Sequence, residues 1–164
     1  MIEPTDVMAA RLGCEVVGEE VPVKTIHRDH YKTFVVFQYM IGNTDWNRKL
    51  RHNIRFIKCD KDPLPIPYDF DYSGLVNAPY AEPHSMMPIK TVTERLFMWT
   101  NKDKDFSATY KLFLSKKDAF YAESRNFPHL DQRVKEEVIA YLDSFYENIE
   151  SPEIMKEEMM KVRR

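Results

Sequence analysis

Apolar residues recur at helical spacing in several stretches of the chain. In residues 28–41 they follow one face of a helix, and Gly42 comes next as a typical helix end. A second stripe, from Leu130 to Ile149, has the same period and predicts a long amphipathic helix. Shorter helices are expected over residues 7–12, 92–99, 106–114 and 117–127, and from Ser151–Pro152 onward.

Two segments in the first half of the chain have strand character instead. Residues 53–59 alternate and are rich in β-formers, and residues 65–71 predict a second short strand. Residues 60–63 have turn composition, so we expect the two strands to form an antiparallel hairpin. Prolines confine the second strand to an edge or a strand end. Residues 72–88 read as a loop. The pattern as a whole predicts an α+β fold that is mainly α.

Composition narrows the class of protein. The 164 residues are 43% hydrophobic and 30% charged, which suits one domain with a real core. The four glycines form no Gly-rich phosphate loop, and the formal net charge of -2 disfavours nucleic acid as a partner. No apolar run approaches the roughly 20 residues of a membrane span, and no signal peptide opens the chain. Localisation stays open, because an upstream segment would be able to carry an export signal. Cys14 and Cys59 are expected to be buried free thiols.

The candidate metal-binding and catalytic residues lie at the ends of the predicted helix and strands. Asp45 follows the helix over 28–41, Asn53 begins the first strand, and Asp69 and Asp71 end the second. If the strands pair through the turn, Asn53, Asp69 and Asp71 meet at one end of the hairpin. Oxygen ligands of this kind suit Mg²⁺, which proteins hold with one or two carboxylates plus substrate phosphates. The alternative is structural, in which the same side chains shape turns.

These segments resemble a known family. Gly42-Asn-Thr-Asp-Trp, His52-Asn-Ile-Arg-Phe and Pro67-Tyr-Asp-Phe-Asp resemble the C-lobe signature of the CotH-type (spore-coat-like) atypical protein kinases. That family carries a G-N-x-D catalytic loop, an Asn heading the next strand, and a P-W-D-x-D metal motif. The opening Met1-Ile-Glu-Pro-Thr-Asp is similar to its hinge pattern, L-x-E-x-x-D.

The resemblance implies a single kinase-C-lobe-like domain over residues 1–164. Residues 1–13 would be the hinge-like start, residues 41–71 the catalytic and metal loops, and residues 90–164 a helical region. A kinase N-lobe would end where this chain begins, so activity is expected to need a supplied N-lobe. Asn53 stands eight positions after Asp45, where kinases usually place the Asn five positions after the Asp, so residues 48–51 are expected to bulge out of the loop.

Roles for individual residues also follow from the resemblance. Asp45 would orient the acceptor hydroxyl as the catalytic residue, while Asn53 and Asp69 would hold Mg²⁺, with Asp69 as the main ligand. Asp71 would be either a second metal ligand or the residue that orients the loop. His52 would contact a phosphate of the ATP cofactor or orient Asp45.

The function expected from this resemblance is an ATP- and Mg²⁺-dependent phosphotransferase, or its catalytic lobe, acting on a protein hydroxyl or a small acceptor. One alternative is a non-catalytic pseudokinase or interaction module. Another is a metal-dependent hydrolase that uses the aspartates directly. The basic positions between Arg48 and Lys58 are open to two interpretations: attraction of an acidic substrate, or a solvated surface.

Overall fold

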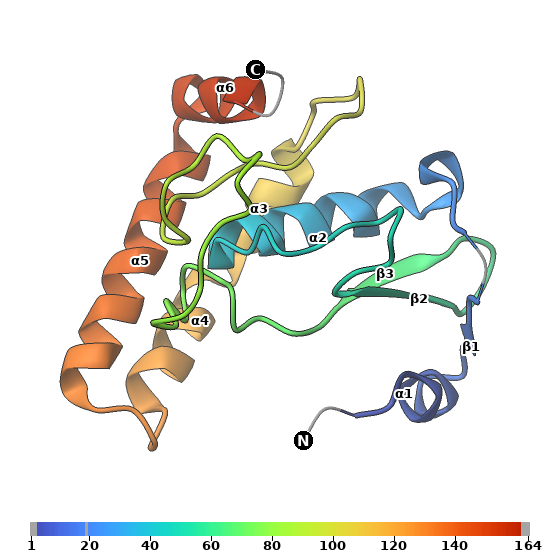
Figure 1. The fold of residues 1–164 in the computed structure, drawn as a ribbon, viewed down its shortest axis with the longest axis horizontal. Coiled ribbons are helices and arrows are strands. Elements are labelled where there is room, and N and C mark those ends of the chain that lie inside the picture. The colour runs from blue at the N-terminus through green and yellow to red at the C-terminus, as the bar shows by residue number, and fades with distance from the viewer. Residues whose placement is uncertain (1–2, 19, 162–164) are drawn as a thin grey trace.

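The fold was analysed in a computed structural model that describes residues 3–18 and 20–161. Within these ranges the chain forms six α-helices and a three-stranded antiparallel sheet (Figure 1). This confirms the expected α+β class with mainly helical content. None of the described helices has both the length and the apolar character needed to cross a membrane.

Most of the helices lie where the apolar pattern predicts them. The long helix α5 begins after Asp131, whose carboxylate accepts a hydrogen bond from the Val134 backbone at 2.9 Å, as an N-cap does. Helix α2 begins after His27, whose ring accepts from the backbone N–H of His30 at 3.3 Å. The bounds are α1 Thr5–Arg11, α2 Arg28–Ile41, α3 Ser107–Ser115, α4 Lys117–Asn126, α5 Gln132–Glu150 and α6 Pro152–Lys161, with a 3₁₀ turn at Val23–Thr25.

The predicted hairpin is confirmed. Strand β2, Ile54–Lys58, pairs antiparallel with β3, Leu64–Pro67, and Ile54 lies opposite Pro67. Strand β3 is an edge of the sheet, as its prolines predicted. The other edge is β1, Glu15–Val16, which pairs with the far end of β2. The sequence did not predict β1, because two residues are too few to show an alternating pattern.

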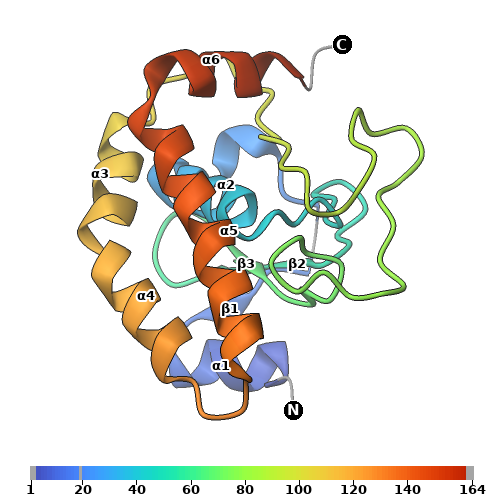
Figure 2. The ribbon, with the colours of Figure 1, turned by 90° about the vertical axis from the view of Figure 1, so that its left-hand side faces the viewer.

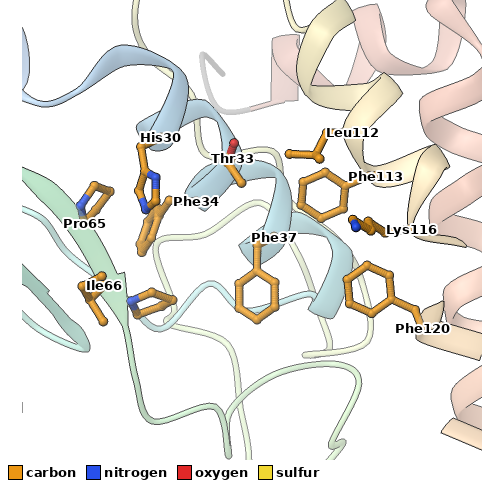
Figure 3. A pocket seen from close by; sticks show the side chains of 11 residues that line it. His30, Thr33, Phe34, Phe37, Pro65, Ile66, Leu112, Phe113, Lys116 and Phe120 are labelled. Carbon is orange, nitrogen blue, oxygen red and sulfur yellow. The ribbon is translucent and has the colours of Figure 1, made fainter. Parts of the chain in front are cut away.

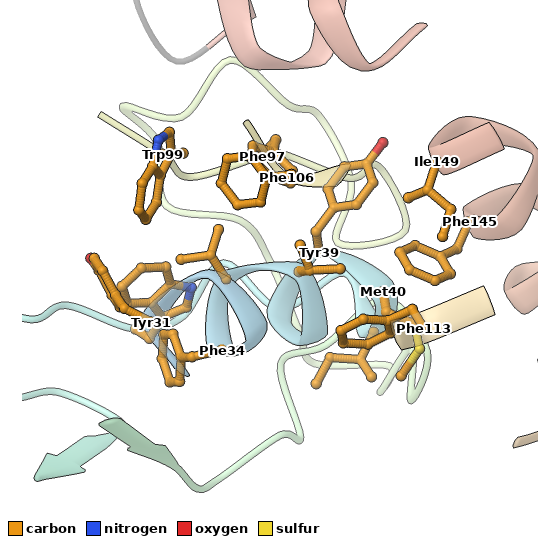
Figure 4. Packing of buried hydrophobic residues seen from close by; sticks show 14 of the residues in the cluster. Tyr31, Phe34, Tyr39, Met40, Phe97, Trp99, Phe106, Phe113, Phe145 and Ile149 are labelled. Atoms are coloured by element: carbon orange, nitrogen blue, oxygen red, sulfur yellow. The ribbon is translucent and has the colours of Figure 1, made fainter. Parts of the chain in front are cut away.

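The hydrophobic core surrounds α2. This helix packs against β3 on one side and against α3 and α5 on the other (Figure 2). Aromatic rings fill the space between them (Figure 4): Phe34 meets Trp46 edge-to-face with ring centroids 4.9 Å apart, and Tyr39 meets Phe97 at 5.2 Å. Burial of α2 on several sides fixes its C-terminus, from which the loop that contains Asp45 emerges.

The helix expected over residues 92–99 is wrong. The segment is irregular, although Phe97 and Trp99 are buried in the core. Its Arg95 side chain reaches other elements instead: Nε donates to the carbonyl oxygen of Tyr39 at 3.0 Å and Nη2 to that of Tyr141 at 2.5 Å. These contacts join α2 to α5, and the segment's backbone follows them rather than its local helical spacing.

The N-terminal prediction also needs correction. Helix α1 occupies much of the expected hinge-like start over 1–13, and Met1 and Ile2 of that prediction lie outside the described residues. The cysteines are not free thiols: Cys14 and Cys59 form a disulfide. Cys59 is exposed and Cys14 half-buried. Strand pairing explains the bond, because the pair Glu15 and Lys58 brings the preceding and following cysteines together.

A partly buried ion pair links the start of α2 to the segment before α3. Lys32 is only 6% exposed, and its Nζ lies 2.6 Å from Oδ2 of Asp103, which Arg28 also contacts. These two cations hold the pKa of Asp103 well below its usual range, with the hydrogen bond from Lys32 as the largest cause. A carboxylate with a lowered pKa stabilises the fold above its unfolded pKa and loses that contribution as pH falls.

We therefore predict that Asp103→Asn lowers the free energy of unfolding at neutral pH. The deficit should shrink as pH falls below about 4, the ordinary pKa of an unfolded aspartate, because wild type then loses the same interaction. Urea unfolding of both proteins between pH 3 and 7 would measure it. Asp60→Asn, in an exposed turn, is the matched control. A deficit that is constant with pH would contradict the prediction.

Candidate functional site

The loop that carries Asp45 is fixed by the end of α2. Gly42 has φ +64°, and the backbone N–H of Asn43 donates to the carbonyl of Gln38 at 2.8 Å, which closes the helix. The Asn43 side chain then accepts from the Asp45 backbone at 2.9 Å. Trp46 is buried directly after Asp45. The Asp45 backbone is thus anchored on both sides while its carboxylate stays partly accessible.

Three of the predicted site residues form one hydrogen-bonded group. Nδ2 of Asn53 donates to both the backbone carbonyl and the carboxylate of Asp45, each at 2.8 Å. The other carboxylate oxygen of Asp45 lies 3.0 Å from Nε2 of His52. Nδ2 of Asn53 also lies 3.3 Å from Nε2 of His52, so the three side chains contact one another. The carboxylate of Asp45 is therefore oriented by two neighbours, and His52 lies where it can orient Asp45.

The long spacing between Asp45 and Asn53 is accommodated as expected. A bridge between Asn47 and His52 closes residues 48–51 into a projecting turn. Arg48 donates to the carbonyl of Val21 at 2.6 Å and Arg51 to that of Val17 at 2.7 Å. These two members of the basic run thus tether the turn to the chain that follows β1.

The hairpin brings the remaining two acids to the same end. Asn53 and Tyr68 flank the paired strands, and the Tyr68 N–H donates to the Asn53 carbonyl at 3.4 Å. Asp69 and Asp71 follow immediately. Both Asn53, at φ +51°, and Asp69, at φ +59°, adopt the left-handed conformation. Asn and Asp tolerate this conformation better than other side chains, although it still costs free energy.

The carboxyls of Asp69 and Asp71 lie close together at this end. Burial and then the neighbouring carboxyl of Asp71 raise the pKa of Asp69, and Asp45 contributes in the same direction. Close carboxylates repel, and a positive charge between them relieves the repulsion. Tyr80 donates to Asp71 at 3.0 Å, so the second carboxylate is held by the loop that follows.

These oxygen donors suit Mg²⁺, whose coordination shell is completed by phosphates and waters, better than a metal whose ligands all come from the protein. Among the described residues no three His, Cys, Asp or Glu side chains converge on a common point. Mg²⁺ does not require that, because one or two carboxylates suffice when phosphates and waters complete its shell. Asp69 and Asp71 would hold such an ion, and Asn53, at the same end of the hairpin, would be a further ligand.

Two cavities adjoin these residues. One, of about 800 Å³, has Asp69 and Asp71 at its wall together with Arg55 and with Met8 of α1. The other, of about 180 Å³, is lined by Asp45 and by the loop that includes Glu82. The sequence predicted a helix over residues 7–12 but not its place in the wall of this cavity, and it predicted Arg55 only as a member of the basic run. Arg55 stacks 4.5 Å from the Tyr68 ring centroid, and no local pattern shows that contact.

A third cavity is separate from the acidic groups. It encloses about 390 Å³ between α2, β3 and the α3–α4 corner, and Phe34, Phe37 and Phe120 point into it (Figure 3). Its lining is almost wholly apolar. Ile66 and Pro67 line both this cavity and the larger acidic one, so β3 is the wall between them.

Comparison with known proteins adds no relative. No protein-family model matches the chain, and neither a curated protein nor a solved structure matches it. The site's chemistry must therefore be inferred from its geometry and from the motifs in the sequence.

Two glycines let the loop of Asp45 approach α5. A Cβ on Gly42 would lie 1.9 Å from the hydroxyl oxygen of Tyr141, and one on Gly74 would lie 2.3 Å from the same atom. The Gly74 N–H donates to the Gly42 carbonyl at 3.1 Å. Both positions therefore exclude a side chain.

We predict that Gly42→Ala lowers the free energy of unfolding by about 2–4 kcal/mol, from left-handed strain plus overpacking. Tyr141→Phe should recover part of this loss in the double variant, because it removes the clashing hydroxyl while the ring stays close. Chemical denaturation of the two single variants and the double variant would measure the coupling. Strictly additive effects would contradict the proposed contact.

Proposed function

We propose that this chain is the catalytic lobe of an ATP- and Mg²⁺-dependent phosphotransferase similar to the CotH-type atypical kinases. The observation that carries the proposal is the group formed by Asp45, Asn53 and His52, with Asp69 and Asp71 at the same end of the hairpin. A carboxylate oriented by an asparagine, beside a second carboxylate at the end of the next strand, matches what phosphoryl transfer requires: positioning of an acceptor and neutralisation of phosphate charge.

The larger cavity suits a nucleotide. Its volume of about 800 Å³ lies within the usual range for small-ligand sites. Met8 and Ile66 offer apolar surface to a base, and Arg55 offers a cation to phosphates. Asp69 and Asp71 lie in the wall of the same cavity, so bound phosphates would share Mg²⁺ with these carboxylates.

The smaller cavity suits the acceptor. It is lined by Asp45, so a hydroxyl bound there lies within reach of the Asp45 carboxylate. In this scheme Asp45 accepts the hydroxyl hydrogen bond and holds the proton as the oxygen attacks. Asn53 and His52 keep the carboxylate in place. Bound Mg–ATP would supply the phosphoryl group, and its Mg²⁺ would neutralise the negative charge of the phosphates.

Substitution of Asp69 tests the nucleotide site. We predict that Asp69→Asn weakens Mg–ATP binding at least about tenfold, because one anionic ligand is lost. Asp45→Asn should keep the affinity and abolish transfer, because Asp45 acts on the acceptor. Isothermal titration calorimetry with and without Mg²⁺ would measure binding, with Asp62→Asn in the exposed hairpin turn as the control.

Three results would contradict the proposal. Folded wild type that binds no Mg–ATP is one, and equal affinity in Asp69→Asn and Asp62→Asn is another. The third is metal-dependent hydrolysis of a substrate that needs no nucleotide, which would favour a hydrolase.

A further inference from the structure

The disulfide lies at the attachment point of one wall of the larger cavity. Thr5 and Met8 of α1 line that cavity together with Tyr68, Asp69 and Asp71, which follow β3. Among the described elements α1 packs chiefly against β1, and β1 contributes only two residues to the sheet. In Figure 1, α1 and β1 lie at the margin of the fold, away from helices α4, α5 and α6.

The core gives α1 little support. The main cluster of buried residues begins at Val21 and includes no residue of α1, in which Ala9 alone among the described side chains is buried. The Cys14–Cys59 bond joins this N-terminal unit covalently to the hairpin. The short β1–β2 pairing and the hydrogen bond from Arg51 to the Val17 carbonyl at 2.7 Å add non-covalent contacts at the same place. One further backbone hydrogen bond, from Val17 to Phe56 at 2.9 Å, supports the same junction.

We propose that Cys14–Cys59 is a reversible redox modification site that controls the larger cavity. In the disulfide form α1 is held as a wall of the cavity; in the dithiol form α1 separates from the hairpin and the wall is lost. The effect on nucleotide rests on the proposed function, whereas the effect on α1 does not. The core between Val21 and Met159 stays folded in both forms.

Exposure determines which sulfur reacts. Cys59 is exposed, whereas Cys14 is half-buried, so an attacking thiolate reaches Sγ of Cys59 first. A dithiol reductant supplies both electrons. Its thiolate forms a mixed disulfide with Cys59, and Cys14 leaves as a thiolate that takes a proton from water. The second thiol of the reductant then closes its own disulfide and releases the thiol of Cys59.

Amide hydrogen exchange before and after treatment with dithiothreitol tests the site directly. We predict that amides in residues 5–11 exchange at least about tenfold faster in the dithiol form, because α1 then opens locally. Amides of α5 should keep their protection, which shows that the core is intact. Unchanged protection of α1, with both thiols confirmed by mass labelling, would overturn the proposal.

Calorimetry with Mg–ATP tests the consequence for the cavity. If α1 is docked a tenth of the time after reduction, affinity falls about tenfold. Equal Mg–ATP affinity in the two forms would overturn control of the cavity. Loosening of α1 with no Mg–ATP binding in either form would support the redox site and contradict the proposed nucleotide function.

The double variant Cys14→Ser/Cys59→Ser is the matched control. It should resemble reduced wild type in both measurements and show no response to dithiothreitol. A response of this variant to dithiothreitol would overturn the assignment to these cysteines. If the variant does not fold, hydrogen exchange of oxidised and reduced wild type still decides the question, because protection of the α5 amides reports whether the core is intact.

Discussion

One guanidinium connects the parts on which the candidate site depends. Arg95 donates to the carbonyls of Tyr39 and Met40 in the last turn of α2, and to the carbonyl of Tyr141 in α5. Its plane also stacks 3.7 Å from the Tyr141 ring. A cation at a helix C-terminus satisfies carbonyls that have no partner within the helix. Arg95 thereby fixes where α2 ends, and that end sets the position of Asp45.

The site uses conformations that few side chains adopt. Asn53 and Asp69 occupy left-handed positions at adjacent ends of β2 and β3, and Gly42 occupies another at the end of α2. A backbone conformation that costs free energy persists where the surrounding contacts leave the residue no other conformation. Here the hairpin, the bridge at Asn47 and the packing of Trp46 supply those contacts. The fold itself therefore fixes the backbone at Asn53 and Asp69.

Local patterns predicted the elements whose own residues determine them. The stripe in residues 28–41 and the alternation in residues 53–59 are local properties, so the helix, the hairpin and the placement of Asn53, Asp69 and Asp71 at one end of it were predictable. The segment 92–99 was not, because the contacts of Arg95 with distant carbonyls override its helical spacing. The Cys14–Cys59 bond escaped prediction for a similar reason: it depends on pairing by β1, a strand of two residues.

The two prolines of β3 have a consequence for association between molecules. The Tyr68 N–H points to β2, so by alternation the positions of Pro65 and Pro67 face away from the sheet. Proline has no N–H to offer there, so this edge loses no bond within the hairpin yet presents no donor to an incoming strand. A strand added at this edge would find the carbonyl acceptors of Pro65 and Pro67 but no N–H donors, so half of the usual hydrogen bonds would be missing. The β3 edge is thereby protected against edge-to-edge aggregation.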